Sequence, residues 1–184
     1  MTQRTQNGLM VGLGQKESPD VGGMIKKERR IVKEIKLTRN FYLRELLTSS
    51  TAVRLGIDNT QISKEVLDNL TALTTKVLQP LRDSFDMAVT VNSAFRCLEL
   101  NRELGSEDTS QHTLGKAADI EIYGIDNYEL AGWISRNLEF DQLILEFYDG
   151  TTNSGWVHVS YSEGNNRGEC LTINKGQIKR GLKR

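Results

Sequence analysis

The chain contains only two histidines, and each lies in a short motif whose other residues also suit metal chemistry. The first motif runs from Ser110 to Asp119 and contains His112, and the second is Trp156-Val157-His158. Two neutral imidazoles and one carboxylate provide three of the four ligands of a tetrahedral zinc site, and the fourth position is then free for water, as in catalytic zinc sites. The sequence therefore predicts a Zn²⁺ site on His112, Asp119 and His158.

Such a site suits the hydrolysis of an amide bond. Zinc polarises a carbonyl and lowers the pKa of its water to about 7. A base must still accept the proton of the attacking water. Glu146 is the first candidate, and Asp141 and Asp149 are weaker ones because they lie at the ends of a predicted strand.

The preference for Glu146 comes from a predicted β-hairpin. Residues 142–148 and 156–161 alternate apolar and polar side chains, and the segment between them is rich in turn-forming residues. If the hairpin is symmetric about Thr152, Glu146 lies directly opposite His158, with Cβ atoms about 5 Å apart. We interpret this as the register in which the apolar sets of both strands share the core face.

Arg96 is the candidate for a fixed positive charge in the site. Its guanidinium stays protonated and binds a carboxylate, or stabilises a developing oxyanion, through two N–H groups. A single arginine is more often a surface residue, so its type alone leaves both readings open. Ser110 and Trp156, from the two histidine motifs, are candidate substrate-binding residues.

Helices and strands must position these side chains. A long amphipathic helix is predicted from an N-cap at Ser63 to about Phe85, with a kink or interruption at Pro80. A second helix is predicted from Asp126 to Leu138. Shorter helices are expected at about residues 41–47, 51–55 and 98–104, and strands at about 88–92 and 118–122.

Length and composition indicate one domain. With 184 residues and 38% hydrophobic content the chain can bury one core, which we place at residues 38–165. Residues 1–37 are interpreted as a flexible charged leader, and residues 166–184 as a basic C-terminal tail. The formal net charge is zero, so no nucleic-acid or membrane partner is expected.

Cysteine content and the N-terminal sequence bear on the compartment. Cys97 and Cys170 are expected to be free thiols, since one pair is no disulfide framework in a chain of this length. No apolar run is long enough for a signal peptide or a membrane span. We therefore expect the protein to be cytoplasmic at synthesis.

The motifs resemble those of a known family. The pattern Ser-x-His-x-x-Gly-x-Ala-x-Asp at 110–119, with a later Trp-x-His, is similar to that of the zinc peptidases of peptidoglycan: D-Ala-D-Ala carboxypeptidases and dipeptidases, and phage L-alanyl-D-glutamate endolysins. Ser-Ala-Phe-Arg at 93–96, followed by Glu99-Leu100-Asn101, resembles that family's Ser-Gly-Tyr-Arg-Ser-x-x-Leu-Asn segment. Residues 41–59 resemble its N-terminal helices, so the resemblance covers about residues 40–161.

The resemblance implies an α+β fold with a small antiparallel sheet and flanking helices. It also implies zinc on His112, Asp119 and His158, with Arg96 as a substrate or transition-state contact. Several relatives place the catalytic acid three residues before the second histidine ligand, where this chain has Gly155. Either Glu146 takes that role or the protein binds zinc without cleaving.

The leading hypothesis is a monomeric zinc metallopeptidase that hydrolyses a peptide bond in peptidoglycan stem peptides, as a carboxypeptidase or an endopeptidase. It would act at the cell wall, and the lack of an export signal favours delivery by phage lysis or by a virion. The alternative is a catalytically inactive wall-binding or virion structural module that keeps the zinc fold. A third possibility is that the basic ends bind nucleic acid, but the sequence contains no recognisable nucleic-acid-binding motif that would support this role.

Overall fold

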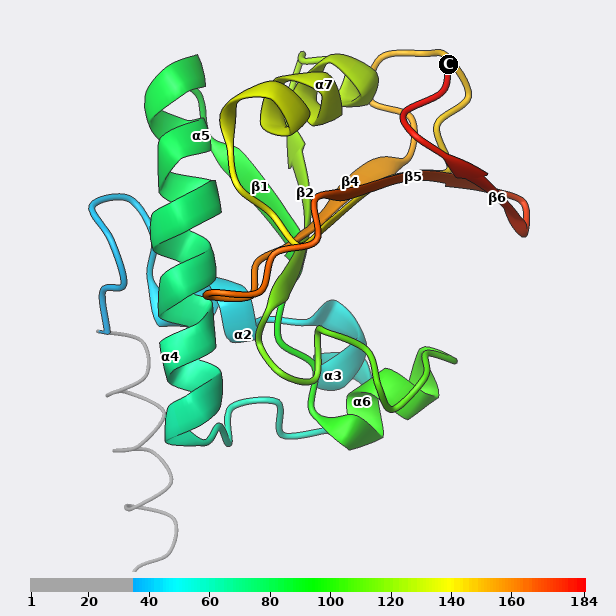
Figure 1. Cartoon of the computed structure of the whole chain (residues 1–184). Coiled ribbons are helices and arrows are strands. Elements are labelled where there is room, and N and C mark those ends of the chain that lie inside the picture. The colour runs from blue at the N-terminus through cyan, green and yellow to red at the C-terminus, as the bar shows by residue number, and fades with distance from the viewer. Residues whose placement is uncertain (1–34) are drawn as a thin grey trace, which may run out of the picture.

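Six strands form one sheet in the order β1-β2-β4-β3-β5-β6. The computed structural model describes residues 35–184, in which helices lie on both sides of this sheet (Figure 1). The strands are β1 (Val89–Ser93), β2 (Ala117–Ile122), β3 (Gln142–Glu146), β4 (Trp156–Ser160), β5 (Glu169–Asn174) and β6 (Gln177–Arg180). The predicted α+β fold is confirmed, although the sheet is mixed because β3 and β5 run parallel.

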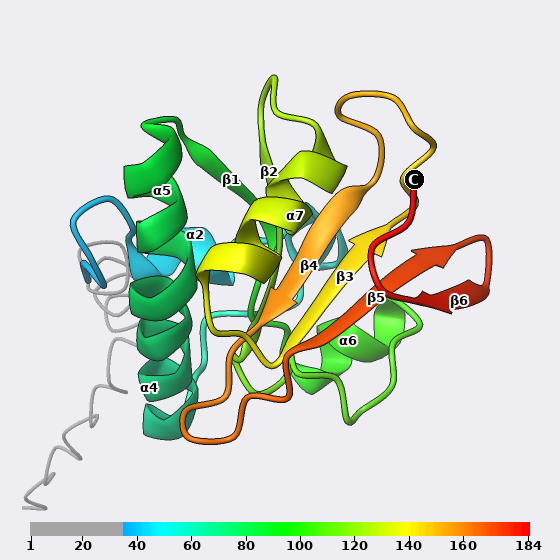
Figure 2. The same ribbon diagram turned by 45° about the horizontal axis from the view of Figure 1, so that its top comes forward.

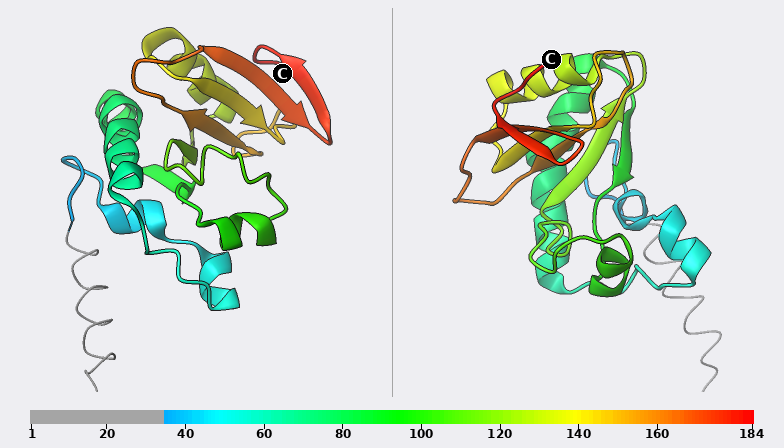
Figure 3. Two further views of the ribbon diagram at one scale, coloured as in Figure 1. Left: turned by 60° about the horizontal axis from the view of Figure 1, so that its bottom comes forward. Right: turned by 90° about the vertical axis from the view of Figure 1, so that its right-hand side faces the viewer.

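The helices divide between the two faces of the sheet. They are α2 (Leu43–Leu47), α3 (Ser50–Leu55), α4 (Lys64–Leu73), the π-helical turn η1 (Thr74–Leu78), α5 (Gln79–Phe85), α6 (Leu98–Glu103) and α7 (Asn127–Asn137). Helix α7 packs across β2, β4 and β3 (Figure 2), and α6 lies on the other side of the sheet (Figure 3). The face under α7 is the apolar core, where Leu130 and Ile134 are fully buried with Leu143, Leu145 and Val157.

The long helix begins as predicted, since the Ser63 hydroxyl accepts a hydrogen bond from the Val66 N–H at 3.2 Å. Its regular hydrogen bonding changes just before Pro80. There the N–H of Gln79 bonds to the carbonyl of Thr74, five residues back. A proline inside a helix supplies no N–H and crowds the carbonyl four residues earlier, and the wider turn of η1 accommodates it. The helix is therefore interrupted at this point but continues through α5.

The β3–β4 hairpin differs in register from the prediction. Ile144, and not Glu146, lies opposite His158, while Glu146 lies opposite Trp156. The difference is two residues, and because side chains alternate with a period of two, Glu146 and His158 still share one face of the sheet. The apolar faces of both strands stay aligned as well, so the apolar pattern is equally compatible with either register.

Phe147 explains the shifted register. Its φ of 53° is left-handed and ends the regular strand at Glu146. The Phe147 N–H donates to the carbonyl of Ile173 in β5. The Phe147 side chain is 47% exposed, whereas Tyr148 is buried. The prediction that the strand alternates through residue 148, with Phe147 in the core, is therefore wrong.

The C-terminal segment differs from its prediction too. The segment 166–184, predicted to be a tail, belongs to the sheet. Strand β5 pairs with β3 from Gln142↔Glu169 to Glu146↔Ile173, and β6 pairs with β5 at the edge of the sheet (Figure 2). The N–H and C=O groups along one side of β3 need partners, and β5 supplies them. The lysines and arginines of this segment conceal its strand pattern, because backbone pairing does not depend on charge.

The domain also begins before residue 38. The Leu43 N–H donates to the Ile35 carbonyl at 2.9 Å, the Leu37 N–H donates to the Phe41 carbonyl at 3.0 Å, and Ile35 and Leu37 pack against the core. The rest of the predicted leader, residues 1–34, lies outside the described residues. None of the helices between residues 35 and 184 combines the length and the apolar character that crossing a membrane requires.

Candidate metal centre

Three elements bring the predicted zinc ligands together. Asp119 in β2 pairs directly with His158 in β4, and His112 reaches them from the loop between α6 and β2. The Asp119 Oδ1 lies 2.9 Å from the His158 Nδ1 and 3.3 Å from the His112 Nε2. The two ring nitrogens are 3.3 Å apart, and all three residues are buried. Within residues 35–184 these three form a group whose ligand atoms converge on one point.

The donor set fits a tetrahedral zinc ion. Donors at about 2.0–2.1 Å from such an ion lie roughly 3.3 Å from one another, which matches two of the three separations observed. The His112 Nδ1 lies 2.7 Å from the carbonyl oxygen of Ala94. A carbonyl only accepts, so in the neutral ring Nδ1 carries the proton and the lone pair of Nε2 faces His158 and Asp119. The carbonyl of Ala94 thus selects the tautomer that a metal ligand needs.

The carboxylate of Asp119 is held in its charged form. Burial acts to raise the pKa of Asp119, but the interactions of its carboxylate with the rings of His112 and His158 outweigh burial and lower this pKa below its ordinary value. The second carboxylate oxygen, Oδ2, accepts a hydrogen bond from the Arg96 Nη2 at 2.6 Å. Asp119 therefore offers Oδ1 to a metal while Arg96 occupies its other oxygen.

Arg96 belongs to this centre and not to the exposed surface. Its side chain is 13% exposed, its Nε donates to the Ser93 hydroxyl at 2.8 Å, and its Nη2 lies 3.3 Å from the His112 Nε2. Arg96 is therefore not an ordinary surface residue.

Asn59 positions the segment that carries Arg96, a role that the sequence analysis missed. Its side-chain amide donates to the carbonyls of Phe95 and Leu47, each at 2.9 Å, and its Oδ1 accepts from the Cys97 N–H at 2.7 Å. Asn59 is 3% exposed. In the sequence Asn59 stands out only as part of the family pattern at 41–59, because a side chain that bonds to distant backbone leaves no periodic signal.

The three ligand candidates share one cavity of about 510 Å³ with Arg96, Ser110, Glu146 and Trp156. It is lined by Arg96, Leu104, Ser106, Ser110, His112, Asp119, Glu146, Phe147, Trp156 and His158. The Trp156 ring packs against Phe147 with centroids 5.0 Å apart, and its buried Nε1–H has no hydrogen-bond partner within residues 35–184. The structure thus brings together Arg96, Ser110, Glu146 and Trp156 beside the three ligands.

The environment of Glu146 favours its protonated form. Burial is the largest cause that raises the pKa of Glu146, and the nearby charge of Asp119 also raises it. The charges of His158 and Arg96 lower this pKa. The net result is a pKa above the ordinary glutamate value. A carboxylate whose pKa is shifted upward is a stronger base, which suits proton transfer.

Neither alternative base lines this cavity. The Asp149 carboxylate accepts hydrogen bonds from the N–H and hydroxyl of Thr151 in the hairpin loop. Asp141 is buried and accepts two hydrogen bonds from the guanidinium of Arg167 and one from the Gln111 Nε2 at 2.7 Å. Because Gln111 precedes His112, Asp141 ties the loop that carries the first histidine to the C-terminal segment.

Acid should remove the contribution of Asp141 to stability. Hydrogen bonds from Arg167 outweigh burial and lower its pKa to about 2, against about 3.9 in an unfolded chain. A depressed folded-state pKa stabilises the fold above the unfolded value, and this stabilisation is lost as pH falls from about 4 to about 2. We expect Asp141→Asn to lower the free energy of unfolding at pH 7 by roughly 1–3 kcal/mol. Between pH 4 and pH 2 the free energy of unfolding of this variant should fall less than that of the wild type.

Urea denaturation at pH 7, 4 and 2.5 measures this difference. Asp68→Asn is the matched control, because Asp68 forms an exposed pair with Lys64 and should change stability little. Parallel pH curves for the wild type and Asp141→Asn would contradict the assignment.

Gly155 cannot carry the acid that several relatives place there. Its φ is 62°, and a Cβ at this position would lie 1.9 Å from the carbonyl oxygen of Glu146. Only glycine fits where the two backbones approach this closely. The chain departs from that pattern because the backbone of β3 occupies the space.

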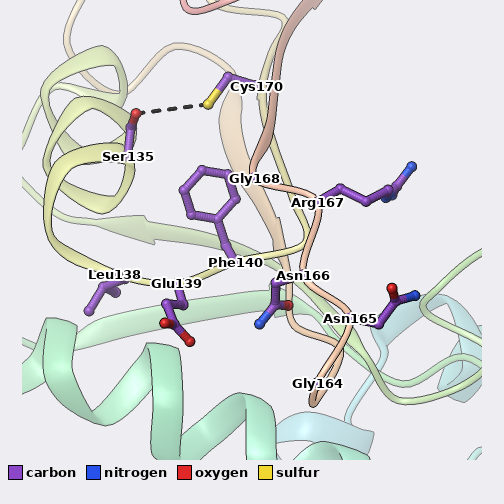
Figure 4. A pocket seen from close by; sticks show the side chains of 10 residues that line it. All are labelled: Ser135, Leu138, Glu139, Phe140, Gly164, Asn165, Asn166, Arg167, Gly168 and Cys170. Atoms are coloured by element: carbon purple, nitrogen blue, oxygen red, sulfur yellow. Dashed lines mark hydrogen bonds between the residues drawn. The ribbon is translucent and has the colours of Figure 1, made fainter.

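A second cavity, of about 560 Å³, lies away from the metal ligands. Figure 4 shows Ser135, Phe140 and Cys170 around it, with the Arg167 side chain pointing away from Ser135. The Ser135 hydroxyl and the Cys170 thiol are 3.8 Å apart, and Cys170 and Cys97 are free thiols, as predicted. This larger cavity contains none of the proposed site residues, so size does not identify the functional site.

A family model matches the part of the chain that contains the candidate metal centre. The family model described as Peptidase M15 matches residues 39–160, which include all three metal-ligand candidates, Arg96 and Glu146. The chain belongs to the Peptidase M15 family, a family of metallopeptidases. No curated protein matches it closely enough to be named as a relative.

Proposed function

We propose that the protein is a zinc peptidase that hydrolyses a peptide bond in peptidoglycan stem peptides. The observation that carries this proposal is the convergence of His112, Asp119 and His158 in one cavity with Glu146 and Arg96. Membership of the Peptidase M15 family supports the same reaction class. In this proposal the protein acts as a monomer at the cell wall, whether it is released by lysis or delivered by a virion.

The chemistry divides between the metal and the side chains. Zinc held by the three ligands would supply Lewis acidity, which polarises a carbonyl and makes water easier to deprotonate near neutral pH. The Glu146 carboxylate accepts the proton of the attacking water and delivers it to the departing amine nitrogen. The Glu146 side chain is half-buried, and Ser110 and Trp156, which line the same cavity, are proposed to contact the substrate.

Arg96 is proposed to orient Asp119 and to contact an oxygen of the substrate. Arg96→Lys keeps the charge but loses the planar arrangement that serves Asp119 and Ser93 together. We expect kcat/KM on a muropeptide to fall about tenfold or more, with zinc near one per chain. The matched control is Arg102→Lys, because Arg102 pairs with Asp108 at the exposed surface and lines no part of the cavity. Unchanged kinetics for Arg96→Lys would remove Arg96 from the reaction.

Mass spectrometry of defined muropeptides tests the proposed function. The protein is incubated with them as purified, after chelation, and after zinc is restored. We expect cleavage only with zinc, and the fragment masses distinguish a carboxypeptidase, which releases one terminal residue, from an endopeptidase. Binding to sacculi without any cleavage, with zinc present, would contradict the peptidase and favour the wall-binding or virion module.

A further inference from the structure

The face of the sheet that carries the metal ligands continues across β5 and β6. Directly paired residues of neighbouring strands point to the same face. Starting at His158, successive pairs lead through Ile144 and Leu171 to Arg180. A second row starts at Trp156 and leads through Glu146 and Ile173 to Ile178. Both rows run across the strands from the site to the outer edge of the sheet, which Figure 2 shows beyond β3.

These rows form an aliphatic strip, which consists of Ile144, Leu171, Ile173 and Ile178. Ile144 is buried, Leu171 and Ile173 are half-buried, and Ile178 is 67% exposed. Exposure thus increases away from the site. Isoleucine and leucine on an exposed strand face are costly to leave in water unless a ligand covers them.

Arg180 closes the outer end of the strip. It is exposed, and within residues 35–184 its guanidinium has no hydrogen-bond or ion-pair partner. Three strand spacings separate it from His158, or about 14 Å at roughly 4.8 Å per spacing. An extended peptide rises about 3.3 Å per residue and would span this distance with about four residues.

We propose that the aliphatic strip and Arg180 form an accessory subsite for the substrate peptide. The strip binds small apolar side chains next to the cleaved bond, and Arg180 pairs with a carboxylate about four residues away. This inference rests on the proposed function and names the part of the substrate that this chain recognises. Continuity with the metal centre and the unpaired charge of Arg180 support this occupant. Strands β5 and β6 also lie beyond the family match at 39–160, so the subsite is an addition to the matched domain.

The β6 strand provides a matched control for this proposal. Lys179 and Arg180 are adjacent and both exposed, but they point to opposite faces of the sheet. Arg180→Glu and Lys179→Glu make the same change in net charge on one strand. Each variant is assayed on two peptides that differ only in whether the remote carboxylate is free or amidated.

We expect Arg180→Glu to raise KM for the carboxylate peptide roughly three- to tenfold, with kcat and zinc content unchanged. The effect should be absent on the amidated peptide and absent in Lys179→Glu. Ile178→Ser should raise KM for both peptides, because it shortens the apolar surface. Equal effects of the two charge changes, or an equal effect of Arg180→Glu on both peptides, would overturn the proposal.

Failure of the proposed function gives a different result. If the wild type cleaves neither peptide, the peptidase assignment fails. Calorimetric binding of the same two peptides to the wild type and to Arg180→Glu then tests the subsite directly. Weaker binding of the carboxylate peptide alone supports it, and equal binding refutes it.

Discussion

Replacing both histidines with alanine is expected to reduce zinc from one per chain to a small fraction and to abolish hydrolysis. His112 and His158 supply two of the three converging donor atoms, and Asp119 alone cannot hold the ion in competition with water. The chain contains no other histidine that might substitute. Because metal ligands must be free of protons, zinc affinity in the wild type should also fall as the pH is lowered.

Elemental analysis of protein purified without added metal measures this effect. The control is a Cys97→Ser, Cys170→Ser double variant, which should keep its zinc because neither thiol belongs to the converging group. Full zinc in the histidine double variant would refute the assignment of the centre. Circular dichroism of each variant shows whether the fold is retained.

Glu146→Gln is expected to reduce hydrolysis about 10²-fold or more while zinc stays near one per chain. The amide keeps the size of the side chain but does not accept the proton. Glu146 is the one of the three acidic candidates that lines the cavity with the metal ligands. Its upward-shifted pKa supports the same role.

Asp149→Asn serves as the control for Glu146→Gln. Asp149 is exposed in the hairpin loop and bonds to Thr151, so its loss should leave turnover near the wild-type rate. A wild-type rate for Glu146→Gln would mean that the shared face of Glu146 and His158 has no catalytic meaning.

Several features could be predicted from the sequence because they depend on the chemistry of neighbouring residues. Ser63 and Asp126, at which the two long helices are predicted to begin, accept hydrogen bonds from the first turns of these helices. The candidate metal ligands could be found in the sequence because few residue types bind zinc and the only two histidines stand in specific motifs. The faces of β3 and β4 followed from strand alternation, which requires no knowledge of the partner strand.

The partners of those elements depended on the tertiary structure. Registers that differ by two residues place the same side chains in the core, so alternation did not reveal that Ile144 rather than Glu146 lies opposite His158. The observed register is the one in which Phe147 adopts a left-handed backbone conformation and donates a hydrogen bond to β5.

Residues distant in sequence completed the site for a similar reason. The pairing of β5 with β3 joins backbone groups whose attraction does not depend on side-chain type, so a basic segment conceals it. Asn59 and Asp141 act through several hydrogen bonds to distant groups, Phe95 and Gln111 among them. The sequence by itself indicated which side chains are candidates for the chemistry. The tertiary structure determined which residues hold them in place, because long-range hydrogen bonds have no periodic pattern along the chain.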